Sequence, residues 1–236
     1  MKSHGSLNHI FRLVWSEALN GWVAVAEQTR GRGKGAGRKL TRLAAAMAAA
    51  AAAALAVPSG LVQAAPAGGQ VTAGAGTIAQ SGTTTTINQT SQNLSLGWKS
   101  FNVGVPETVN FVQPSASAIA VNRIADTNGS QILGRLNANG QVYLINPNGI
   151  LFGQNAQVNV GGLVASTLDL GDNSLSGPAR TFAGNGTGSV VNQGTINAAD
   201  GGYVALLGQH VSNQGVITAQ LGTVVMGAGS AATLTF

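Results

Sequence analysis

From about residue 65 onward, short runs of alternating apolar and polar residues are separated by Gly- and Asn-rich turns. The clearest run occurs twice, as VNQGTINA at residues 191–198 and as SNQGVITA at residues 212–219, so that Asn192 recurs as Asn213. A period near 20 with short strands and Asn-Gln-Gly turns is typical of a β-solenoid, in which each rung is covered by the next. The pattern predicts an all-β fold, a right-handed parallel β-helix over residues 70–236. The residues expected to point inward are Ile196, Ile217, Val204 and Val224.

Weaker signals extend the same pattern. Residues 202–204 align with 222–224 at a slightly shorter displacement, and residues 158–164 form a fainter third copy. The less repetitive stretch over 70–135 contains strand-like runs at 83–87 and 109–112, and we expect these irregular strands to cap the N-terminal end of the solenoid. A β-sandwich with Gly-rich turns is the competing interpretation.

The leader, residues 1–64, has a different pattern. Leu43–Val57 is almost pure Ala and Leu, and it follows the basic cluster Arg30–Arg42. Fifteen helical residues span about 22 Å, less than the roughly 30 Å of a bilayer core. A cleavable signal peptide over residues 1–64 is therefore predicted, with cleavage after Ala64 or Ala67; an uncleaved anchor helix is the alternative. Further upstream, apolar residues at helical spacing predict an amphipathic helix in this leader. They are Phe11, Val14, Trp15, Ala18, Leu19, Trp22 and Val25.

Charge also divides at this boundary. Residues 1–64 carry a net charge of +6 and the remainder −1, so the basic balance belongs to the leader and gives no support for nucleic-acid binding. The chain contains no cysteine, which excludes disulfides and thiol-ligated metals. About 170 residues beyond the leader are enough to bury a sizeable core.

Residues suited to catalysis are sparse. Asp169 and Asp172 are the closest carboxylates beyond the leader, but their surroundings predict a turn, and His210 is the only histidine there. Glycan cleavage needs clustered carboxylates, a cation site or a poised base. We therefore expect no enzyme activity, no metal and no cofactor. A β-helix polysaccharide lyase is a distant alternative, because parallel β-helices also host such enzymes.

The most informative motif is Asn146-Pro147-Asn148-Gly149, which lies between two apolar runs. Pro at the second position fixes φ, and Asn-Gly suits a tight turn. In context, this NPNG turn closely resembles a hallmark of the N-terminal two-partner secretion (TPS) domain of filamentous-haemagglutinin-type exoproteins. The resemblance extends over residues 77–236 and is nearest to the high-molecular-weight adhesin branch. A second family motif, NPNL, has only the fragment Asn93-Leu94 as a counterpart.

Other blocks carry the same resemblance: WKSFNV at 98–103, TVNFVQP at 108–114, NRI at 122–124 and GRLNANG at 134–140. In the leader, NHIFRLVW at 8–15, GWVAVAE at 21–27 and RGRGK at 30–34 resemble the extended signal-peptide region of very large Gram-negative exported proteins. The resemblance implies that NPNG acts in secretion and that a set of residues in these blocks contributes to partner recognition. That set is Trp98, Phe101, Asn102, Arg123 and Arg135.

By resemblance, residues 65–236 form a domain that directs the secretion of a large surface adhesin or haemagglutinin, and this domain is expected to be truncated at its C-terminal end. The general secretion machinery would carry the chain to the periplasm. An Omp85-type (TpsB-like) outer-membrane β-barrel transporter would then recognise it, and β-helix folding would be nucleated outside the cell. The family leaves one alternative open, the export domain of a contact-dependent toxin or a haem-acquisition exoprotein. The host surface ligand is not implied.

Overall fold

The computed structural model describes residues 11–16, 21–26, 65–171, 175 and 177–235, and these residues contain strands and turns but no helix. They belong to two separate compact units, residues 1–59 and residues 60–236. The described part of the chain holds no helix of the length and apolarity needed to cross a membrane.

The leader unit corrects one expectation. Five of the seven residues predicted to form an amphipathic helix lie in two antiparallel strands, β1 (Phe11–Ser16) and β2 (Gly21–Ala26), in a register that pairs Trp15 with Trp22. The other two, Ala18 and Leu19, lie outside the described residues. Val, Trp and Phe favour strands, and short apolar runs do not distinguish a strand from a helix by spacing alone. The apolar run at residues 43–57 lies outside the described residues.

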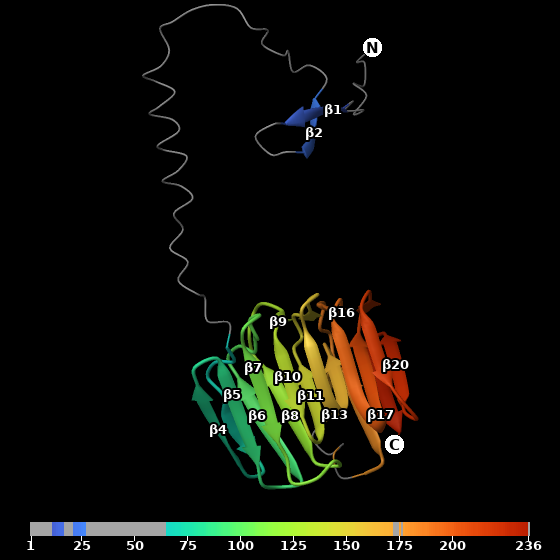
Figure 1. The fold of residues 1–236 in the computed structure, drawn as a ribbon. Coiled ribbons are helices and arrows are strands. Elements are labelled where there is room, and N and C mark those ends of the chain that lie inside the picture. The colour runs from blue at the N-terminus through green and yellow to red at the C-terminus, as the bar shows by residue number, and fades with distance from the viewer. Residues whose placement is uncertain (1–10, 17–20, 27–64, 172–174, 176, 236) are drawn as a thin grey trace, which may run out of the picture. The chain divides into compact units, whose positions relative to one another are not determined.

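The second unit is a β-solenoid, as predicted, and Figure 1 shows its strands stacked side by side in chain order. The solenoid has three faces. Six parallel strands form the first face, and six more form the second. The first face contains β5 (Thr84–Gln89), β7 (Thr108–Val112), β10 (Arg135–Ala138), the first half of β13 (Gln157–Ser166), the first half of β17 (Thr195–Gly208) and β19 (Val216–Ala219).

The second face contains β6 (Asn93–Trp98), β8 (Ile119–Ile124), β11 (Gln141–Ile145), the second halves of β13 and β17, and β20 (Thr223–Ala228). The third face contains β9 (Ser130–Ile132), β12 (Ile150–Phe152), β16 (Ser189–Asn192) and β18 (His210–Asn213). Because β13 and β17 each continue around the corner between the first two faces, these two faces belong to one sheet.

The register explains the repeat seen in the sequence. In one half of the rung Thr195 pairs with Val216, which confirms the displacement between the runs 191–198 and 212–219. In the other half Tyr203 pairs with Thr223, which confirms the slightly shorter displacement between 202–204 and 222–224. Val158 pairs with Ile196, almost two repeats further along the chain, so the faint third copy is a true rung followed by an insertion. The insertion carries β14 (Asp169–Leu170) and β15 (Ala179–Ala183).

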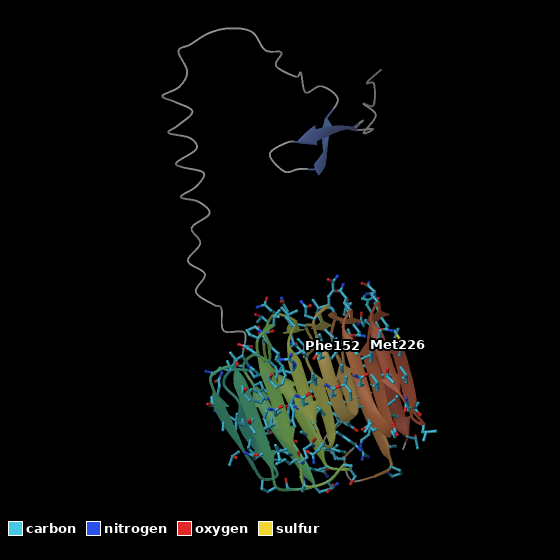
Figure 2. The ribbon with its side chains drawn as sticks, in the orientation of Figure 1. Phe152 and Met226 are labelled. Carbon is cyan, nitrogen blue, oxygen red and sulfur yellow. The ribbon has the colours of Figure 1, made fainter. Side chains whose placement is uncertain are left out.

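Apolar side chains from all three faces fill one core, as the alternating pattern predicts. Ile196 and Val204 are fully buried, and Ile217 is partly buried against the same core. Val224 lies in register with Val204 but is 46% exposed, because no further strand of the described chain covers the last rung. Figure 2 labels one side chain of each kind: Phe152 is fully buried, whereas Met226 in the last rung is also 46% exposed.

The N-terminal end is capped by β3 (Gln70–Ala73) and β4 (Gly76–Ser81), which pair antiparallel with β6 and β5. A cap at this end was predicted, but it is shorter than expected, because the chain already runs in regular parallel rungs from Thr84 onward. At the corner between the first two faces, glycines stack from rung to rung. A Cβ on Gly202 would lie 2.1 Å from the Gly161 carbonyl oxygen, so only glycine permits this close approach.

Candidate functional site

The NPNG motif forms the corner between the second and third faces of the solenoid. It joins β11, which ends at Ile145, to β12, which begins at Ile150. The Gly149 amide donates to the Asn146 carbonyl at 3.0 Å, which closes the turn, and Gly149 has a φ of 111°. Asn, Pro and Gly occupy the positions at which a type I turn favours them. Local turn chemistry and the ends of two strands therefore fix this corner.

The Asn146 side chain is the centre of the corner. It is fully buried, and its Nδ2 donates to the Asn128 carbonyl at 3.1 Å and to Ser130 Oγ at 3.0 Å. Its Oδ1 accepts from the Asn148 amide at 2.9 Å. One side chain thus binds its own turn and also the preceding rung. A buried amide with every polar atom satisfied holds two rungs in a single arrangement.

Asn148 has a different environment. It is exposed, and its Nδ2 donates to the Asp126 carbonyl at 2.7 Å in the preceding rung. The Asp126 carboxylate in turn accepts from the Asn128 amide at 2.9 Å. The two asparagines of the motif therefore both reach back to residues 126–130, one from inside the corner and one from its surface.

The following rung packs against the same turn through Gly186 and Gly188, two glycines that the sequence pattern did not identify. The Gly188 amide donates to the Pro147 carbonyl at 3.1 Å. A Cβ on Gly188 would lie 2.2 Å from the Gly149 nitrogen, and one on Gly186 would lie 2.9 Å from the Pro147 oxygen. In the sequence, glycines alternate at 184, 186 and 188, and this pattern by itself indicates only a flexible loop. Their stacking on the turn is evident only in the folded structure.

Beside the corner, the outer surface of the third face forms an open groove of about 450 Å³. Asn148, Gly149 and Ser130 lie along it, together with Gln131 and Ser189. Ile150, Leu151 and Val191 also line it, and the strands beneath it, β9, β12 and β16, pair with one another. No residue of this lining is charged, so the groove offers hydrogen bonds and apolar contacts but no ion pair.

Among the residues predicted to recognise a partner, the two aromatic side chains lie inside the solenoid. Trp98 is 3% exposed and Phe101 is fully buried, and their rings meet edge to face at 5.2 Å between centroids. Trp98 Nε1 donates to Asn122 Oδ1 at 2.9 Å. In the folded domain these two side chains therefore support the first rung from within.

The three polar residues of that set are dispersed. Asn102 Oδ1 accepts from the Gln131 amide at 2.8 Å and so joins the first two rungs on the third face. Arg123 Nε forms an ion pair with Asp169 at 2.9 Å, and its Nη2 donates to the Leu170 carbonyl. Arg135 is exposed on the first face, where its Nε donates to Gln157 at 3.3 Å. The structure does not bring these three residues together: Asn102 contacts a residue of the groove beside the NPNG corner, whereas Arg123 and Arg135 lie on the other two faces.

Residues considered for chemistry are also separated. Asp169 is paired with Arg123, Asp172 lies outside the described residues, and His210 is exposed at the start of β18. Within the described ranges, no group of three or more His, Cys, Asp or Glu side chains is placed to hold a metal ion.

A second apolar cluster lies on the outward side of the second face, beneath an antiparallel sheet of β14, β15 and β21 (Ala231–Thr235). Two tyrosines cross this layer: Tyr143 and Tyr203 share a hydrogen bond of 2.7 Å between their hydroxyls, and Tyr203 donates to Gln141 Oε1 at 2.6 Å. Burial raises the pKa of Tyr143 and that of Tyr203 above the usual value, so both rings stay neutral and act as hydrogen-bonding groups.

Comparison with known proteins agrees with this architecture. Residues 62–235 match the family described as TPS secretion domain, and residues 8–56 match the Extended Signal Peptide of Type V secretion system. The crystal structure of the HMW1 secretion domain from Haemophilus influenzae is similar, with a TM-score of 0.66 and 35% identity over 71% of this chain and 46% of that one.

Two curated relatives are also similar, both named Heme/hemopexin-binding protein and both from Haemophilus influenzae. One, from strain Rd, is 39% identical over 168 residues, and the other is 51% identical over 85 residues. These matches cover 65% and 36% of this chain but only 18% and 9% of the relatives, which are much longer. The predicted resemblance is confirmed: this chain is an exported protein with an extended signal peptide, and it belongs to the family of TPS secretion domains.

Proposed function

We propose that this chain directs the secretion of a large surface adhesin or haemagglutinin, and that an Omp85-type outer-membrane β-barrel transporter recognises it. Membership of the TPS family already implies a cognate two-partner transporter. The observation that carries the proposal is the NPNG corner, where one buried asparagine joins two rungs beside an open groove. Before the rungs stack, recognition would use the NPNG turn itself, whose hydrogen bonds from the Asn148 and Gly149 amides to Asn146 lie within the motif.

Folding outside the cell follows from the same architecture. Each rung pairs with its predecessor along nearly its full length, so stacking can proceed one rung at a time as the chain emerges. Because the chain has no cysteine, no disulfide opposes passage of an unfolded strand through a pore. In this proposal the domain carries no catalytic function.

The test is release of the chain from cells with and without the transporter. Co-expression with the barrel protein encoded beside the gene is expected to move most of the chain from the periplasm to the medium, and omission of the barrel is expected to retain it. Immunoblots of the two fractions measure the ratio, with a periplasmic protein as the leakage control. Equal release in the absence of any barrel would overturn the proposal.

A second candidate is the export domain of a haem-acquisition exoprotein. The names of the two curated relatives favour it, although the shared region covers 18% or less of their length. Both candidates assign the same secretion role to this domain and differ only in what is exported with it.

We propose that the leader is cleaved after Ala64, the first of the two predicted sites. Pro66 is buried, the Ala67 amide donates to the Ser100 carbonyl at 2.9 Å, and the Lys99 amide donates to the Ala67 carbonyl at 3.0 Å. Cleavage after Ala67 would remove Pro66 and separate this bridge from the chain, whereas cleavage after Ala64 retains both. N-terminal sequencing of released protein is expected to begin at Ala65; a start at Gly68 would contradict the assignment.

A further inference from the structure

The outward side of the second face is apolar, which is unusual for the outside of a solenoid. Val121, Tyr143, Val164, Ala205 and Val225 occupy successive rungs in register and point away from the main core. Together they form a continuous apolar column. Such a surface must be covered in a stable monomer, since large exposed apolar patches invite association.

The cover is the outer sheet formed by β14, β15 and β21. Phe182 in β15 is fully buried, and its ring lies 6.2 Å from that of Tyr143 between centroids. Ala232 and Leu234 in β21 pack against the same cluster. Polar contacts attach the other end of the sheet, through the ion pair of Arg123 with Asp169.

Most of the pairing that holds β15 comes from the far end of the chain. Every residue of β15 pairs with β21, from Ala179 with Thr235 to Ala183 with Ala231. Only Phe182 and Ala183 pair with β14. The partners in β15 and β21 are distant in sequence, because the strands of two solenoid rungs, β16 to β20, are placed between them.

We propose that β21 is the closing strand of the domain: it fixes β15 over the outward apolar column, and the column stays uncovered until β21 pairs. The short contact with β14 cannot hold β15 by itself, because isolated short strand pairs are marginal in water. In a chain that emerges with its N-terminus first, the inner rungs would therefore form before their outer apolar side is covered. The closing role is a property of the fold and does not rest on the proposed function.

Trypsin provides the test, because Arg180 lies within β15 and is cut only when that strand leaves the sheet. In the full chain, Leu234→Asn removes an apolar contact on the covered side of β21. We expect cleavage after Arg180 to rise about tenfold or more, measured as the rate of appearance of the fragment ending at Arg180 by mass spectrometry. Cleavage after Arg135, on the first face, should not change. The matched control is Thr233→Asn, on the exposed side of the same strand, and it should leave both rates unchanged.

A disulfide provides the reverse experiment. Thr181 and Thr233 are paired in register with their Oγ1 atoms 3.4 Å apart, and the chain has no other cysteine to compete. Added to Leu234→Asn, the pair Thr181→Cys and Thr233→Cys should restore wild-type protection at Arg180 when oxidised and lose it again on reduction. Unchanged protection in Leu234→Asn alone would overturn the proposal. The proposal is also overturned if the oxidised disulfide variant is cut after Arg180 as fast as the reduced one. This criterion still applies if Leu234→Asn by itself leaves Arg180 without any protection.

Discussion

Asn146→Ala is expected to reduce release of the chain into the medium by about tenfold or more while leader cleavage proceeds normally. The substitution deprives the Asn128 carbonyl, Ser130 Oγ and the Asn148 amide of their partners in a buried corner. Each orphaned polar group costs about 1–3 kcal/mol, partly offset by relaxation, so a loss of roughly 2–4 kcal/mol in the free energy of unfolding is expected. Processed chain should then accumulate or be degraded in the periplasm.

The measurement compares periplasm and medium by immunoblot in cells that also express the transporter, together with urea unfolding of the purified domain. Asn155→Ala is the matched control, since Asn155 is exposed in the turn after β12. Asn148→Ala should have an intermediate effect, because its exposed side chain makes one bond to the Asp126 carbonyl. Full release of Asn146→Ala would remove the NPNG corner from the mechanism.

Gly188→Ala is the second substitution with a large expected effect, and it approaches the same corner from the following rung. The added Cβ would lie 2.2 Å from the Gly149 nitrogen and 2.3 Å from the Asn148 carbonyl carbon. Because both atoms belong to the backbone, no side-chain rearrangement can relieve the overlap, and the two rungs must separate. A loss of about 3 kcal/mol or more in the free energy of unfolding is expected, together with a defect in release like that of Asn146→Ala.

Gly177→Ala is the control for this substitution, since a Cβ there meets nothing within 4 Å. Urea unfolding midpoints and release into the medium should be measured for both variants. A stable and fully released Gly188→Ala protein would show that the third face tolerates separation of its rungs at the corner, and that the stacking of Gly188 on NPNG has no part in secretion.

Several features could be predicted from sequence because each depends on residues close together in the chain. Apolar and polar residues alternate at 191–198 and 212–219, which indicates strands, and the Asn-Gln-Gly residues indicate corners. The sheet pairs these two runs in the register that the sequence repeat predicts. The NPNG turn forms as its residue types require. The helix predicted for the described parts of the leader was wrong for a related reason. The short apolar runs at 11–16 and 21–26 fit either a helical or a strand period, and their β-branched and aromatic residues form strands.

The sequence by itself thus determined the fold class, the export leader and the family, because strand alternation, turn chemistry and linear motifs are local. Only the tertiary structure decided which side chains are buried in the folded domain, since the same alternation places Trp98 and Phe101 inside the first rung. It also decided the stacking of Gly188 on Asn148 and the pairing of β15 with β21. These contacts join residues that are distant in the chain, and their register follows from the length of each turn of the solenoid. That length is not constant, because the insertion after β13 nearly doubles one turn relative to the next.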